Sequence, residues 1–272
     1  MADFQYKERI EGAQEAIKRS RWVFLILTIV SLALLITAWN AYFSWTREIL
    51  LTLHSWTSDT VAAHAQQHLI EEWVNSQMID IPVLGIHIGI SDAAPVGGFG
   101  ILILSIWFYF STRRENRAIA ELLIDTWRET DEVRSRIFHS IASYLVFLTI
   151  ANTDDPISSL KTPLRKDKPF ATLRAVVRML FFLAPFTILA IVACDTASIF
   201  WLAAPYRQGH EPLIKGHIPK GFWIEWGSIE VIALALAVFA AFLCFQALRF
   251  TAATGKVLNE YSKLVRGAAR QE

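Results

Sequence analysis

Charged residues are almost absent from four long stretches of this 272-residue sequence. The stretches run from Trp22 to Trp45, from Ala93 to Thr112, from Met179 to Pro205 and from Trp226 to Leu248. Each is long enough to cross the roughly 30 Å hydrocarbon core of a bilayer. The hydrophobic residues, 54% of the chain, are concentrated in these runs. The pattern predicts an integral membrane protein rather than one large soluble core.

Cysteine and histidine are missing from the places where cofactor chemistry would need them. Both cysteines, Cys194 and Cys244, lie inside apolar runs, which excludes a zinc knuckle or a secreted disulfide framework. All seven histidines fall outside the four runs, so a haem held between membrane helices is not expected. The P-loop, HExxH, GxSxG and CxxC motifs are absent as well. We therefore expect no cofactor and no enzymatic activity, and the net charge of +1 predicts no nucleic-acid partner.

Lysine and arginine are distributed unevenly among the segments that join the apolar runs. Segments 1–21, 46–92, 113–178, 206–225 and 249–272 contain 5, 1, 12, 3 and 5 of them. Because basic residues collect on the cytoplasmic side of a membrane, this alternation predicts that both termini and the middle segment are cytoplasmic. A cell (inner, cytoplasmic) membrane is the expected location, with the lipid bilayer as the first partner.

The predicted fold class is an all-α integral membrane protein with four transmembrane helices, cytoplasmic helical extensions and a small extracytoplasmic helix plus β-hairpin. The predicted order is a cytoplasmic amphipathic helix (1–21), the first span (22–45), an extracytoplasmic helix and hairpin (46–92), the second span (93–112), a cytoplasmic helical region with a basic loop (113–178), the third span (179–205), an extracytoplasmic loop (206–225), the fourth span (226–248) and a cytoplasmic helix (249–272).

Two periodic patterns support the segments outside the spans. Isoleucines alternate at positions 79 and 81, and again at 86, 88 and 90, around Pro-Val-Leu-Gly, which indicates a β-hairpin. Apolar residues from Ile119 to Ile137 recur every three to four residues, so the second span is expected to continue as one helix into the cytoplasm. That stripe either packs on helices formed by the two terminal segments or forms a docking face for another subunit.

Polar residues inside the apolar runs are the main candidates for function. Asp195 lies within the third run, and a carboxylate at such a position is costly unless it faces a bundle interior, a cavity or a partner. Asn40 and Glu230 lie at similar depth in the first and fourth runs. Three roles remain open: a neutral Asp195 bonded to Asn40 or a backbone carbonyl, a proton- or cation-handling group, or a partner for a basic residue of another subunit. Pro185 is expected to kink the third span.

Two weaker sets of residues have specific chemical interpretations. His64, His68 and Glu72 would share one face of a helix, as zinc ligands do, although a polar face produces the same pattern. Arg165, Lys166, Lys168 and Arg174 precede the third span, where they could bind anionic lipid headgroups or simply follow the charge rule for orientation.

Taken together, these features favour a non-catalytic structural or accessory subunit that anchors or assembles a membrane complex. Its partners would be copies of itself or other membrane-protein subunits. The alternative is a homo-oligomeric pore or ion-conducting protein in which Asp195 and Glu230 line a polar path.

Overall fold

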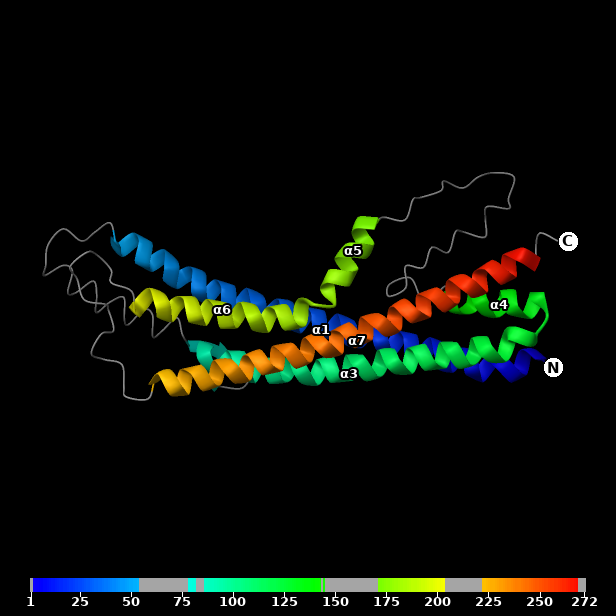
Figure 1. The fold of residues 1–272 in the computed structure, drawn as a ribbon, viewed down its shortest axis with the longest axis horizontal. Coiled ribbons are helices and arrows are strands. Elements are labelled where there is room, and N and C mark those ends of the chain that lie inside the picture. Colours follow the sequence, from blue (N-terminus) through cyan, green and yellow to red (C-terminus); the bar gives the residue numbers. More distant parts are fainter. Residues whose placement is uncertain are drawn as a thin grey trace, which may run out of the picture. The chain divides into compact units, whose positions relative to one another are not determined.

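A computed structural model describes residues 2–53, 78–81, 86–142, 144, 171–203 and 222–268. Almost all of these residues are helical (Figure 1). The three long helices are α1 (Ala2–Leu53), α3 (Ile90–Asp125) and α7 (Phe222–Ala268). The shorter elements are α4 (Asp131–Ala142), α5 (Ala171–Leu180), α6 (Leu183–Ala203) and the single 3₁₀ turn η1 (Thr126–Arg128).

Buried and half-buried residues recur along each long helix in alternating steps of three and four. This spacing averages 3.5 residues, which is the repeat of helices that pack side by side as in left-handed coiled coils. We call these the seam positions. They are 6, 10, 13, 17, 20, 24, 27, 31, 34 and 38 in α1, 94, 98, 101, 105, 108, 112, 115, 119 and 122 in α3 with 126 in the adjoining η1, and 230, 233, 237, 240, 244, 247, 251, 254, 258 and 261 in α7.

The described chain divides into two compact units. The first unit comprises residues 1–28, 104–182 and 241–272, and the second comprises residues 29–103 and 183–240. Each long helix contributes its charged end to the first unit and much of its apolar run to the second.

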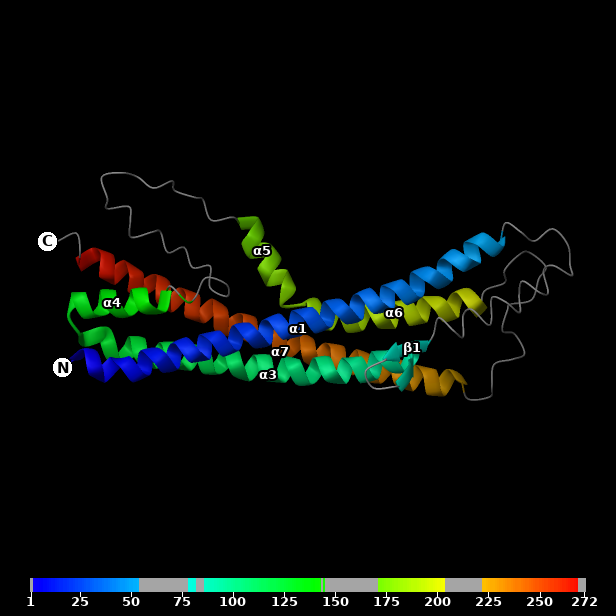
Figure 2. The same ribbon diagram turned by 180° about the vertical axis from the view of Figure 1, so that it is seen from behind.

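The first unit is held together by an apolar core formed by four helices. Figures 1 and 2 both show α4 beside the C-terminal part of α7. The core includes Ile17 of α1, Leu122 of α3, Phe138 of α4 and Tyr261 of α7, all buried. The stripe that begins at Ile119 therefore packs within the chain, on helices formed by both terminal segments, as one of the two alternatives predicted.

The second unit relies on small residues and backbone contacts. Figures 1 and 2 show α6 beside α1, where the Thr187 hydroxyl donates a hydrogen bond to the Ser31 carbonyl oxygen at 3.1 Å. A Cβ atom at Gly98 would lie 3.3 Å from Leu236 and 3.6 Å from Ile188. Glycine at this seam position therefore lets α3 approach two neighbouring helices closely, as small residues do in membrane bundles.

Two short strands precede α3. Strand β1 (Met78–Ile81) pairs antiparallel with β2 (Ile86–Gly89), and Ile79 lies opposite Ile88. These strands contain four of the alternating isoleucines, whereas the fifth, Ile90, is the first residue of α3. The extracytoplasmic helix expected between residues 46 and 77 lies outside the described residues beyond Leu53, where α1 ends.

The second span continues as one helix beyond residue 112, as predicted, but only to Asp125, so the prediction of one helix as far as Ile137 is wrong. Helix α3 ends at Asp125 and η1 follows, before α4 begins at Asp131. The Thr126 hydroxyl lies 2.9 Å from the Leu122 carbonyl oxygen and 2.9 Å from the Tyr261 hydroxyl. This tertiary contact lies at the break, which no proline or glycine marks in the sequence.

The third apolar run is interrupted where Pro185 predicts a disruption of the helix. Helix α5 ends at Leu180, and a turn at residues 181 and 182 separates it from α6. Pro185 is the third residue of α6. A proline has no N–H to donate to the carbonyl group four residues earlier, here that of Phe181, and its ring clashes with that group, so the turn lies at the position that Pro185 disfavours in a continuous helix.

Three of the described helical segments are long and apolar enough to cross a membrane. They are Tyr6–Tyr42 in α1, Ala94–Arg128 in α3 and Ile224–Leu258 in α7. A shorter apolar segment, Leu183–Ala197, lies in α6. These helices indicate a membrane protein.

Candidate functional site

Asp195 occupies an inward-facing position on α6. Its side chain belongs to the second unit and is only 2% exposed. The indole Nε1 of Trp226, in the first turns of α7, donates a hydrogen bond to the Asp195 Oδ2 atom at 2.8 Å. A buried carboxylate requires such donors, because its desolvation is otherwise uncompensated.

A second acidic side chain adjoins Asp195. Glu230 lies one helical turn after Trp226 on α7 and is 6% exposed. Neither of its carboxyl oxygens has a hydrogen bond of ordinary geometry, yet the group lies close enough to Asp195 to interact with it electrostatically. The two acidic groups and the indole therefore form one buried cluster, which we call the carboxyl pair with Trp226.

The local sequence explains why these side chains meet. Buried residues on α6 recur at 184, 188, 191 and 195, so Asp195 continues that helix's inward face. Glu230 is the first buried seam position of α7. Among the described residues of the second unit, Arg47 is the only lysine or arginine. Two adjoining carboxyl groups that are buried in an apolar unit can hold one proton between them or ligate a cation.

Three other polar residues lie in the first and fourth apolar runs. Asn40 is exposed on α1, whereas Asp195 is buried. Thr37 donates its hydroxyl to the Ala33 carbonyl oxygen of its own helix, and Ser228 donates to the Glu225 carbonyl oxygen. Sequence reasoning placed Trp226 only as a residue at the end of an apolar run, although it supplies the direct contact to Asp195.

The two weaker sets fall mostly beyond the described residues. His64, His68 and Glu72 lie outside them, as do Arg165, Lys166 and Lys168. Arg174 lies in α5. Within the described parts of the chain, no cluster of three histidine, cysteine or acidic residues is arranged to hold a metal ion.

A further polar cluster is buried in the first unit. Glu115 is 3% exposed on α3, and the Arg21 guanidinium of α1 acts on it electrostatically. Ser20 is also buried there. Ser20 and Glu115 occupy seam positions, so the 3.5-residue repeat is the sequence signal that could have identified them.

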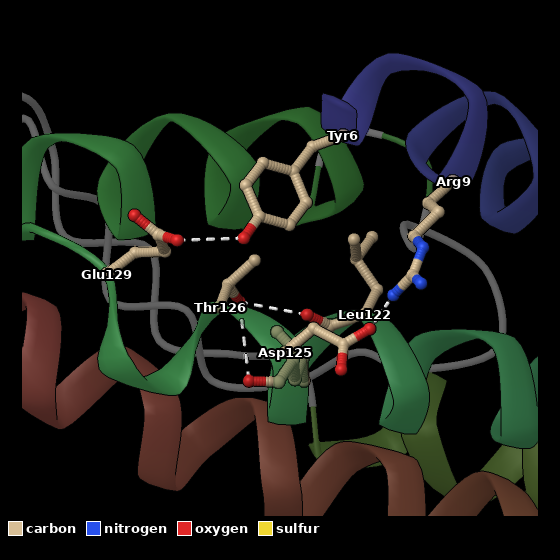
Figure 3. Close-up of polar contacts among 7 residues, drawn as sticks. Tyr6, Arg9, Leu122, Asp125, Thr126 and Glu129 are labelled. Carbon is tan, nitrogen blue, oxygen red and sulfur yellow. Dashed lines mark hydrogen bonds and ion pairs between the residues drawn. The ribbon is translucent and has the colours of Figure 1, made fainter. Parts of the chain in front are cut away.

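Polar contacts also close the end of the first unit (Figure 3). The Tyr6 hydroxyl donates to Glu129 Oε1 at 2.9 Å, and Arg9 forms an ion pair with Asp125. Thr126 links this network to Tyr261 of α7. Burial raises the pKa of the Tyr261 phenol above its ordinary value, because the charged phenolate is disfavoured in the core.

Comparisons of the chain with protein-family models, curated proteins and solved structures find no match.

Proposed function

We propose that the chain is a four-span protein of the inner membrane with both termini in the cytoplasm, and that it is a non-catalytic subunit that anchors or assembles a membrane complex. Helix α6 is the third of these four spans. Its 21 residues extend about 31 Å at about 1.5 Å per residue, which matches the hydrocarbon thickness. The alternation of basic residues among the connecting segments supports the orientation.

The observation that carries the assembly role is an exposed apolar patch in the first unit. Ile124 lies in the last turn of α3 and Trp127 three residues later in η1, and Val257 lies one turn before Tyr261 on α7. The rings of Trp127 and Tyr261 are 6.2 Å apart, which brings the two helix surfaces together. The three patch residues are 70%, 51% and 41% exposed.

Lipid does not account for this patch in the proposed topology. Ile124 lies eleven residues beyond Arg113, which is about 16 Å further along the helix than the charged end of the span. Large apolar side chains grouped at such a position are typical of protein contact surfaces, where tryptophan is enriched. The patch therefore supports contact with another polypeptide chain on the cytoplasmic side.

The experiment is to extract the protein with its native lipid into nanodiscs and to measure the mass and composition of the assembly. We expect a complex larger than one chain that is lost when Ile124→Ser and Trp127→Ser are combined. Glu121→Ser is the matched control, because Glu121 is exposed on the same helix and pairs only with Arg117 among its described contacts. If the unaltered protein and the Glu121→Ser control both have the mass of a single chain, the assembly role is contradicted.

A second function is favoured by the carboxyl pair with Trp226. Adjoining acidic groups buried in an apolar unit are typical of sites that bind protons or cations within a membrane. In this alternative the protein is a homo-oligomeric, ion-conducting protein, and Asp195 and Glu230 line the path. Asp195→Asn should then change ion flux in proteoliposomes, whereas unchanged flux would remove this role.

A further inference from the structure

Helix α5 is strongly amphipathic. Its apolar residues Leu173, Val176, Val177 and Leu180 follow the spacing of one helical face. Arg174 and Arg178 lie four residues apart and occupy the opposite side of the helical wheel. A helix with an apolar face and two arginines opposite it has the pattern of segments that lie in a membrane surface.

The chain covers only part of the apolar side of α5. Val177 and Leu180 are half-buried, whereas Val176 is 52% exposed and Met179 is 73% exposed. Phe182, in the turn that follows, is 37% exposed. All three of these exposed side chains are large and apolar. An apolar environment around them would remove this surface from water.

The end of α5 is fixed at a definite level of the first unit. The Phe181 side chain is buried, and its ring centroid lies 5.0 Å from that of Phe24 and 5.4 Å from that of Phe108. Phe24 follows Arg21 by three residues, and Phe108 precedes Arg113 by five. The aromatic trio therefore lies about 5–8 Å inside the charged ends of both spans. That depth matches the 5–10 Å at which the apolar face of an interfacial helix is buried.

We propose that α5 lies in the cytoplasmic surface of the bilayer and binds anionic lipid headgroups through Arg174 and Arg178. Ten residues extend only about 15 Å, which is too short for a span and suits a helix lying in the surface. The exposed Val176 and Met179 face the acyl chains, and the arginines face the phosphates. Anionic lipid is the occupant because the charge of the polar side is positive and because the exposed residues on the apolar side are large and uncharged. The inference rests on the proposed membrane topology.

The test places one nitroxide label on each of three single-cysteine proteins in nanodiscs. The labelled variants are Met179→Cys in α5, Phe186→Cys on the exposed face of α6 and Arg117→Cys on the exposed face of α3, in a background with Cys194→Ala and Cys244→Ala. The rate at which the nitroxide collides with oxygen is high when the label lies in lipid. The rate at which it collides with a water-soluble nickel chelate is high when the label lies in water. The nanodiscs contain either zwitterionic lipid alone or a mixture with an anionic phosphatidylglycerol.

We expect the Met179 label to be protected from nickel, at a depth between the labels at Phe186 and Arg117. Anionic lipid should increase that protection. Arg174→Gln with Arg178→Gln should abolish the increase, whereas Arg128→Gln with Lys256→Gln, an equal loss of charge elsewhere in the first unit, should leave it intact.

The other outcomes separate the two proposals. A Met179 label as accessible to nickel as the Arg117 label, with the Phe186 label in lipid, overturns the inference for α5 alone. A Phe186 label in water overturns the membrane topology itself. A protected Met179 label that responds neither to anionic lipid nor to the arginine substitutions overturns the headgroup role.

Discussion

The indole N–H of Trp226 is directed at the carboxyl group of Asp195, with 2.8 Å between donor and acceptor. The two residues lie on different helices, α7 and α6, and 31 positions apart. The hydrogen bond therefore ties the start of α7 to an acidic side chain that cannot reach water. Its removal tests how much of the second unit depends on this contact.

Trp226→Phe keeps an aromatic ring but removes the donor. We expect a loss of about 1–3 kcal/mol in the free energy of unfolding, because Asp195 remains buried with one partner fewer. Steric trapping in bicelles measures that free energy. Trp107→Phe is the control, since Trp107 is half-exposed on α3. An equal effect of both substitutions would show that ring packing, and not the hydrogen bond, is responsible.

A double-mutant cycle tests the contact between the two carboxyl groups. Asp195→Asn and Glu230→Gln each preserve shape while removing one acidic group. We expect the effects on unfolding free energy to be non-additive by about 0.5–3 kcal/mol, the range for residues in contact. Pairing Asp195→Asn with Glu225→Gln, an exposed position on α7, should give additive effects. Additivity in both cycles would argue that the carboxyl groups act independently.

The aromatic trio offers a comparison between adjacent residues. Phe181→Ala should cost about 3–5 kcal/mol, because the ring is buried against Phe24 and Phe108. Phe182→Ala, at a neighbouring and partly exposed position, should cost far less, on the order of 1 kcal/mol or below. Thermal unfolding of the purified protein in detergent ranks the two variants. The reverse ranking would contradict the packing of Phe181.

Tyr261 gives the first unit a dependence on alkaline pH. Its folded pKa is raised by burial, so its contribution to stability is complete below the unfolded pKa of about 10 and is lost as pH rises through the folded value. The melting temperature should therefore fall above about pH 10. Tyr261→Phe should weaken this fall, while also costing about 1 kcal/mol for the lost contact with Thr126. An identical pH profile in both proteins would assign the alkaline sensitivity to other groups.

The sequence allowed prediction of features that depend on local pattern. Long apolar runs predicted membrane-length helices, and the stripe that contains Ile119 and Leu122 predicted a face that packs on another helix. The break after Asp125 could not be predicted, because it depends on Thr126 meeting Tyr261, 135 residues away. The contact between Trp226 and Asp195 could not be predicted either, because it joins two helices. Helix packing, and not the local sequence, decides which side chains meet there. Pro185 did indicate the interruption of the third run, because a proline disfavours a helix at the residue four positions before it, which here lies in the turn at residues 181 and 182.

The unbroken 3.5-residue repeat of α7 restricts changes in length as well as changes in identity. One residue inserted between Arg249 and Phe250 would rotate everything after it by about 100° about the helix axis. Thr251, Thr254 and Leu258 would then leave the side of the helix that carries Cys244 and Ala247. Substitutions at exposed positions such as Ala252 or Lys256 leave the buried residues of α7 on the same side of the helix. Insertions and deletions in this stretch of α7 should thus be far more damaging than most exchanges of one residue for another.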